Sequence, residues 1–149
     1  EQVMLIKSLC YMVIFAALVF FAPGCSDNPH EGTSAKEYYD RAFSFAHAGN
    51  IEEAINLYTL AIEKDPEFID AYYNRGVMHY FLREYKRAIE DLNKVIEKRP
   101  DHVMAYASRG SVYDKIGDDQ KALSDYRKAA QLGDEDVQEH LRSKGISWQ

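Results

Sequence analysis

Arginine recurs at a fixed interval beside a small residue, and it is the first side chain here that could do chemistry. Arg41, Arg75 and Arg109 are evenly spaced along the chain, and the last two stand in the related strings "AYYNRG" and "AYASRG". A guanidinium group can hold a carboxylate or a phosphate through two parallel hydrogen bonds, so an evenly spaced set could recognise an acidic ligand. We favour a simpler interpretation, in which Asp91 and Asp125 pair with two of these arginines and Arg41 has no matching acid.

Other reactive side chains do not form a catalytic or metal-binding motif. The five histidines are not arranged at metal-ligand spacing, and the sequence has no H-E-x-x-H, no C-x-x-C, no phosphate-binding glycine loop with lysine and no nucleophile elbow. His79 lies in an apolar run and is predicted to pack against its neighbours rather than bind a ligand. The sequence therefore predicts no enzyme, no cofactor and no metal site.

The charges of the chain argue against a nucleic-acid partner. Its formal net charge is −6, and its lysines and arginines alternate with acids, as in "REYKRAIEDLNKVIEKR". Phosphate recognition needs a clustered basic surface, whereas interleaved charges are typical of a solvated helix face.

The hydrophobicity of the chain is concentrated at its beginning. Residues 4–25 read "MLIKSLCYMVIFAALVFFAPGC", in which a lysine precedes an apolar run over 9–22. A membrane-spanning helix needs about 20 apolar residues, so this shorter run is more typical of a secretory signal. We interpret residues 1–24 as a signal peptide.

Cys25 follows this run directly and would be the only cysteine left after cleavage. "Ala-Pro-Gly-Cys" resembles the bacterial lipobox, and this resemblance implies that Cys25 is acylated and that residues 25–34 form a flexible tether. The protein would then be anchored in the cell envelope and face the periplasm, with Ser26 favouring the outer membrane. Ordinary cleavage, which would leave a soluble secreted or periplasmic protein with a free thiol, and an uncleaved membrane anchor are the alternatives.

The rest of the chain repeats itself with a fixed period. Three copies of equal length align as 35–68, 69–102 and 103–136, and small or aromatic residues recur at matching positions in each. Each copy contains two runs with apolar residues three and four positions apart, which predicts two amphipathic helices. The sequence thus predicts three helical hairpins.

Glycine and proline mark the ends of these helices. Gly49 and Gly117 fall between the two runs of their copies, where a left-handed residue can end a helix, and Arg83 stands at the matching place in the middle copy. Pro66 and Pro100 stop the second helix of the first two copies. Asp118 is predicted to cap a helix, and the segment "DEDVQEHLRSKGI", with Asp134 as N-cap, acids first and bases last, predicts a further helix; we interpret residues 137–149 as the capping helix and tail.

The repeat resembles the tetratricopeptide repeat, whose signature is W-x2-L-G-x2-Y, then A-x3-F, then P. The resemblance covers residues 35–136 and implies an all-α fold, a right-handed superhelical solenoid of three hairpins plus a capping helix. Stacking is required because one hairpin cannot bury its apolar face alone.

In this family the first helix of each repeat lines a concave groove that binds a peptide. Carried over to this chain, the resemblance places the following residues in the groove: Lys36, Tyr39, Phe43, Tyr73, Asn74, Val77, Tyr80, Ser108 and Ser111. Asn74 could bond a peptide backbone with both its donor and its acceptor.

Some members clamp the carboxylate of a peptide with two lysines, two asparagines and an arginine. Of these five places only Asn74 keeps the family residue, and Tyr39, Phe43, Met104 and Ser108 occupy the others. The expected ligand is therefore an apolar or aromatic peptide segment of a protein partner.

Two classes of function remain open from the sequence. One is a membrane-tethered adaptor or assembly factor for an envelope complex, such as a secretion or pilus system. The other is a structural component that associates with further copies of itself, forming a homo-oligomer.

Overall fold

The computed structural model describes residues 33–149, so Cys25 and the interpreted signal peptide lie outside the described residues. Within this range the chain forms seven helices. They are α2 (Ala35–His47), α3 (Ile51–Lys64), α4 (Ile69–Phe81), α5 (Tyr85–Lys98), α6 (Val103–Ile116), α7 (Asp119–Gln131) and α8 (Glu135–Ser143). The prediction of three helical hairpins followed by a capping helix is confirmed.

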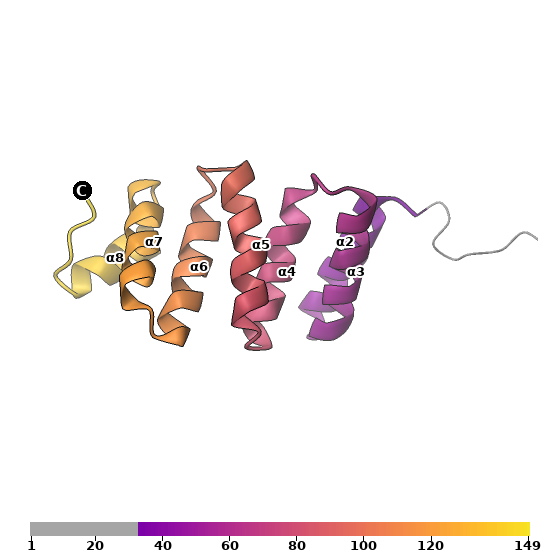
Figure 1. The fold of residues 1–149 in the computed structure, drawn as a ribbon, viewed down its shortest axis with the longest axis horizontal. Helices are drawn as coiled ribbons and strands as arrows, with labels where there is room; N and C mark the ends of the chain where they lie inside the picture. Colours follow the sequence, from indigo (N-terminus) through magenta and orange to yellow (C-terminus); the bar gives the residue numbers. More distant parts are fainter. Residues whose placement is uncertain (1–32) are drawn as a thin grey trace, which may run out of the picture. The chain divides into compact units, whose positions relative to one another are not determined.

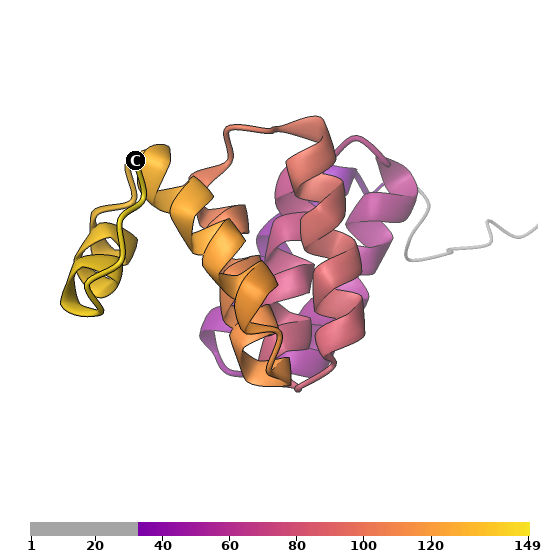
Figure 2. The same cartoon turned by 60° about the vertical axis from the view of Figure 1, so that its left-hand side comes forward.

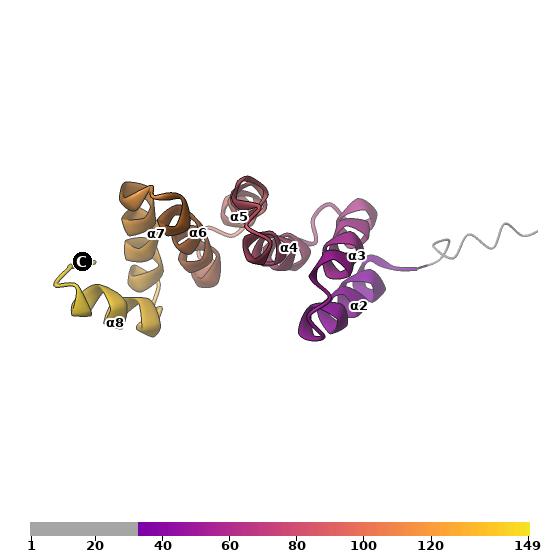
Figure 3. The same cartoon turned by 90° about the horizontal axis from the view of Figure 1, so that it is seen from below.

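The helices stand side by side in chain order (Figure 1). Seen from below, α2 and α4 lie on one side of the row and α3 and α5 on the other, and α6 and α7 stand next to each other along it (Figure 3). Helix α8 closes the row against α7 and lies on the side of the first helices (Figures 2 and 3). Over the first two hairpins the row therefore has two different faces, one made by the first helices and one by the second helices.

Side-chain caps begin several of these helices. The Ser34 hydroxyl accepts the backbone N–H of Glu37, and the Glu37 carboxylate accepts the backbone N–H of Ser34 in return. Asp118 and Asp134 cap α7 and α8 in the same way, each accepting a backbone N–H three residues on. Each cap satisfies a donor that the first helical turn leaves without a partner.

The three hairpin turns share a left-handed residue. Gly49 and Gly117 have φ of +80°, as their place between the helical runs predicted, and Arg83 takes φ of +61° at the matching position in the middle hairpin. The backbone conformation of this turn is thus kept even where the glycine is missing.

Two buried clusters each extend from one hairpin into the next. One buried cluster joins α2 and α3 to Ala71 at the start of α4, and a second joins α4 and α5 to Ala105 and Val112 of α6. The paired helices meet closely at Gly76, where an added Cβ would lie 3.2 Å from the Asp91 Cβ. No helix within residues 33–149 is long and apolar enough to cross a membrane.

Candidate binding face

The nine residues assigned to the groove by resemblance all lie on the first helices α2, α4 and α6. We call these nine residues the first-helix face. Lys36 and Phe43 are exposed, and the other seven are half-buried. The structure brings some of them into direct contact, and the contacts join one hairpin to the next.

Tyr39 and Asn74 form the first of these contacts. The Asn74 side-chain amide donates to the Tyr39 hydroxyl oxygen over 2.8 Å and to the Asp70 carbonyl oxygen over 3.1 Å. Both N–H groups of Asn74 are therefore used within the protein, and only its amide oxygen is left for a partner. We expected Asn74 to bond a peptide backbone with both its donor and its acceptor, but only the acceptor is available.

Tyr73 and Ser108 form the equivalent contact one hairpin further on, with 3.5 Å between their hydroxyl oxygens. Both pairs join residues 35 positions apart, one more than the repeat period. These pairs were not predicted, although a search for polar residues at that separation among the groove positions would have found them. Together they tie α2 to α4 and α4 to α6.

An aromatic cluster surrounds Tyr39 at the α2 end of the face. The Tyr39 ring stacks on Phe68 with centroids 4.8 Å apart and lies 5.6 Å from the ring of Tyr58. Burial, together with the negative charge of Asp70, raises the pKa of Tyr39 above its usual value. Phe68, which was not among the predicted groove residues, is thus part of the wall of this face.

Four large apolar side chains on the first helices remain open to solvent: Phe81 and Ile116 are the last residues of α4 and α6, and Phe43 and Met104 lie further inside their helices. Phe43 is 46% exposed and Met104 is 59% exposed. Met104 lies near the start of α6, and Phe43 lies within α2. They are surfaces that a partner could cover.

Two charged residues at the start of the first helices have ion-pair partners. The Lys36 ammonium lies 2.6 Å from the Asp40 carboxylate, and Asp70 lies 2.8 Å from the guanidinium of Arg99. No group of three or more histidines, cysteines and acids within 33–149 could hold a metal ion. The face offers aromatic and apolar contacts rather than a concentration of charge.

The repeated arginines bind within the protein, as the favoured interpretation predicted. Arg75 makes two hydrogen bonds of 2.8 Å to Asp91 in its own hairpin, and its third nitrogen donates to Thr59 of the preceding hairpin. Burial alone would lower the pKa of Arg75, but the hydrogen bonds to Asp91 and the negative charge of Asp91 raise it. This guanidinium is therefore committed to a junction between hairpins.

Arg109 repeats this arrangement with Asp125 at 2.7 Å and with Asn93 of the preceding hairpin. The hydrogen bonds from Arg109 to Asp125 raise the pKa of the guanidinium. Arg41 is exposed and has no ion pair within the described residues, in line with the absence of a matching acid in its hairpin. The arginines do not form a ligand-binding ladder.

His79 is packed, as expected. It is 6% exposed, and its Nδ1 lies 2.6 Å from a Glu84 carboxylate oxygen. The contact with His79, helped by Arg87, lowers the pKa of Glu84. His79 thus holds the turn between α4 and α5 rather than a ligand.

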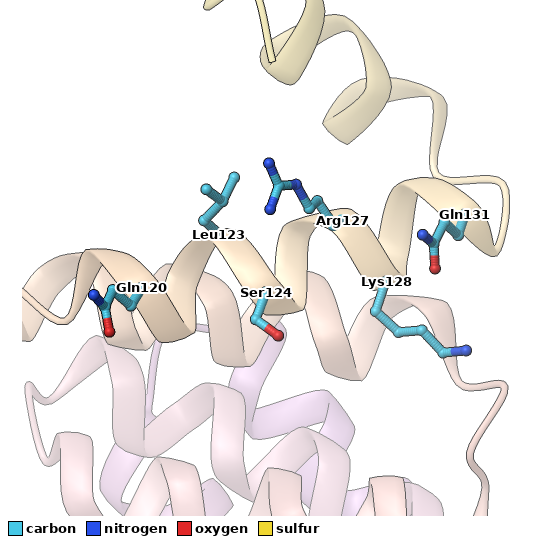
Figure 4. A pocket seen from close by; sticks show the side chains of 6 residues that line it. All are labelled: Gln120, Leu123, Ser124, Arg127, Lys128 and Gln131. Atoms are coloured by element: carbon cyan, nitrogen blue, oxygen red, sulfur yellow. The ribbon is translucent and has the colours of Figure 1, made fainter. Parts of the chain in front are cut away.

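A separate shallow hollow follows helix α7, lined by Gln120, Leu123, Ser124, Arg127, Lys128 and Gln131 (Figure 4). The C-terminal tail folds back onto this helix. There Arg127 donates a hydrogen bond to the Ser147 carbonyl oxygen, and Gln131 donates one to the Trp148 carbonyl oxygen. This contact was not predicted from the sequence. The hollow contains none of the residues of the first-helix face.

Family models match the repeated part of the chain. Tetratricopeptide repeat models match residues 69–102 and 105–132, and a further TPR repeat model matches residues 44–82. A search of curated protein sequences finds no match to this chain.

Solved structures share the fold. A crystal structure of MamA is 28% identical, with a TM-score of 0.66 over 71% of this chain and 62% of MamA, so this chain spans less than two thirds of that relative. The second TPR of Spaghetti (RPAP3) bound to the HSP90 peptide SRMEEVD is 26% identical, with a TM-score of 0.65 over 67% of this chain and 93% of that one. The first TPR of Spaghetti, bound to the same peptide, is 22% identical with a TM-score of 0.70 over 74% and 89% of the two chains, and shows the fold alone.

Proposed function

This chain belongs to the tetratricopeptide repeat family, and we propose that it is a membrane-tethered adaptor whose first-helix face binds an apolar or aromatic peptide segment of a protein partner. The observation that carries the proposal is the exposure of Phe43, whose ring stacks near that of the half-buried Tyr39, together with the exposure of Met104 on α6. Tyrosine suits such a surface because it offers a large contact area with few rotatable bonds and a hydroxyl group at its tip.

The chemistry of the face favours an apolar ligand over an acidic one. The peptide bound by the two Spaghetti domains, SRMEEVD, is acidic. Here Lys36 is neutralised by Asp40, and Tyr39, Phe43 and Met104 stand where carboxylate-clamping members have basic or amide residues. A peptide in this groove would gain most from placing apolar side chains on Phe43 and Met104.

The test is a peptide-binding titration with exposed residues changed one at a time. A synthetic acetylated, amidated peptide with leucine and phenylalanine at alternate positions serves as the ligand, and SRMEEVD as the acidic comparison. Phe43→Ser and Met104→Ser should each weaken binding of the apolar peptide by about 1–3 kcal/mol, as is typical of interface anchors. Ile116→Ser removes an apolar side chain of similar exposure (48%) at a hairpin turn and should change nothing.

Two results would contradict this assignment. One is binding of SRMEEVD that is tighter than that of the apolar peptide and is lost in Phe43→Ser, which would restore an acidic ligand at the first-helix face. The other is equal loss in the Ile116→Ser control, which would show that the peptide adheres to any exposed apolar side chain.

The membrane tether is the second part of the proposal. The support for it is the apolar run of residues 9–22 followed by Gly24 and Cys25. In a bacterial host we expect the mature protein to partition with membranes through acylated Cys25, and Cys25→Ser to accumulate as unprocessed precursor. Normal cleavage and soluble release of that variant would favour the secreted or periplasmic alternative.

The adaptor would serve as an assembly factor for an envelope complex, such as a secretion or pilus system. Self-association is the competing role, in which Phe43 and Met104 bury against a second copy. Sedimentation of the detergent-solubilised protein at micromolar concentration separates the two, because a monomer supports the adaptor and a stable dimer that Phe43→Ser dissociates supports self-association.

A further inference from the structure

The turn between α4 and α5 differs from the other two hairpin turns in its backbone. Arg83 has φ of +61°, and it is the only residue other than glycine with a positive φ within 33–149. Glycine occupies the matching position in the other hairpins, at Gly49 and Gly117. Because a side chain makes the left-handed conformation less favourable, glycine would serve the fold better here. Strain of this kind at one exposed position is a reason to look for a function.

Two large apolar side chains precede Arg83 at the end of α4. Phe81 is 59% exposed and Leu82 is 38% exposed. The matching residues of the first hairpin, His47 and Ala48, present no such pair. We call Phe81, Leu82 and Arg83 the middle-turn tip. Adjacent exposed apolar side chains often indicate an interaction site.

The free charge at the middle-turn tip is positive. Arg83 is exposed and has no ion-pair partner in the described part of the chain, and the same is true of Lys86. The nearby carboxylate of Glu84 is already engaged, 2.6 Å from His79 and 3.2 Å from Arg87. In a chain of net charge −6, an unpaired base beside exposed apolar side chains is complementary to an acidic and apolar ligand.

We propose that the middle-turn tip is a docking point, separate from the first-helix face, for a partner's peptide segment that places an apolar side chain beside an aspartate or glutamate. The apolar side chain covers Phe81 and Leu82, and the carboxylate binds the Arg83 guanidinium through charge-assisted hydrogen bonds. The left-handed backbone at Arg83 is retained because it keeps a cation directly after the two apolar residues in the chain, where glycine would supply none.

A flat anionic membrane fits this edge less well than a peptide does. The three hairpin turns lie along the same edge of the row (Figure 1). The neighbouring turns carry the exposed acids Glu52, Glu53 and Asp119 where their second helices begin. A planar anionic surface that reached Arg83 would also meet these acids. Glu52 and Glu53 line a hollow together with Leu82, so a peptide fits only when it places its apolar side chain on Leu82 and its carboxylate at Arg83.

The test begins with a phage-displayed library of random twelve-residue peptides, selected on the immobilised full chain. Enriched peptides are synthesised and titrated against variants by fluorescence anisotropy. Arg83→Gly and Leu82→Ser should each raise the dissociation constant about tenfold or more, the loss expected for one charge-assisted or apolar anchor. Ile116→Ser is the matched control, because Ile116 occupies the position of Leu82 in the third hairpin, and it should leave the affinity within about twofold.

Arg83→Gly also protects the test against a trivial explanation. Glycine relieves the left-handed backbone, so the variant should melt at a higher temperature than the parent while binding more weakly. Loss of binding in a more stable protein cannot come from unfolding.

Each remaining outcome decides against the middle-turn tip. The proposal would be overturned if the selection enriched no peptide that pairs an apolar residue with an acid. It would also be overturned if such peptides bound with the same affinity to the parent, Arg83→Gly and Leu82→Ser. Peptides lost only on Phe43→Ser belong to the first-helix face, so the two sites succeed or fail separately. A further assay is cosedimentation with vesicles of phosphatidylcholine and phosphatidylglycerol in equal parts. If the protein cosediments and Arg83→Gly abolishes this, the middle-turn tip binds lipid instead.

Discussion

The buried pair of Arg75 and Asp91 allows a demanding test of how the hairpins are held together. Asp91 is replaced by leucine, because Leu57 occupies the matching position of the first hairpin and is buried there at 3% exposure. The substitution leaves the Arg75 guanidinium, whose side chain is 18% exposed, without the carboxylate that accepts two of its hydrogen bonds. Only the bond to Thr59 would remain.

The magnitude follows from the burial of both partners. Removing one member of a buried, hydrogen-bonded ion pair costs about 3–5 kcal/mol, since the other charge is left in a site of low polarity. Asp91→Leu and Arg75→Leu should each lower the free energy of unfolding by that amount. The double variant should lie within about 1 kcal/mol of the parent, because a packed apolar pair replaces a desolvated ionic one at little net cost.

The assay is a double-mutant cycle by urea unfolding, followed by far-ultraviolet circular dichroism. With single losses of at least about 3 kcal/mol and a double loss of at most about 1 kcal/mol, we expect a coupling energy of at least about 5 kcal/mol between the two positions. The exposed pair Lys36–Asp40 is the control, with side chains 76% and 54% exposed, and Lys36→Ala should cost less than about 0.5 kcal/mol. Additive effects at Arg75 and Asp91 would refute the view that this pair acts as a unit.

Gly76→Leu should lower stability by roughly 1–3 kcal/mol through overpacking, because even an added Cβ would lie 3.3 Å from the Leu92 Cγ; an unchanged melting temperature would show that the helices do not meet there. Hydrogen bonds from the backbone and hydroxyl of Ser34 lower the pKa of Glu37 from 4.5. The stability that Glu37 adds to the fold is therefore complete above pH 4.5, and it is lost as the pH falls through the lower pKa that Glu37 has in the folded protein. Glu37→Gln should therefore reduce the melting temperature at pH 7 but not at the acid end of the titration. Burial raises the pKa of Tyr58 from 10 to about 12, so its contribution to stability is present below pH 10 and is lost as the pH rises toward 12. Tyr58→Phe should remove the last step of the ultraviolet phenolate titration. An unchanged titration would place Tyr58 in solvent.

Local sequence predicted the helices because their signals are local. The spacing of apolar residues, the left-handed turns at Gly49 and Gly117 and the caps at Asp118 and Asp134 each depend on residues a few positions apart. The pairing of arginine with aspartate within a hairpin could also be predicted, because the hairpin places matching positions of its two helices opposite each other. Arg83 shows the limit of this reasoning, since its turn keeps the left-handed conformation that glycine favours.

Contacts between hairpins were decided only by the tertiary structure. The offset between neighbouring hairpins brings Tyr39 to Asn74 and Tyr73 to Ser108, pairs that are one position further apart than equivalent residues of neighbouring copies, and brings Thr59 to Arg75. A period read from sequence states which positions are equivalent, but it does not state how far one hairpin turns against the next.

The sequence by itself thus determined the repeat, its helices and the residue types on the first-helix face. The tertiary structure decided which of those side chains are used up in binding one another and which, like Phe43, stay open to a partner. The reason is physical: helix formation depends on neighbours along the chain, whereas exposure and hydrogen-bond pairing depend on the close packing of segments that are distant in sequence.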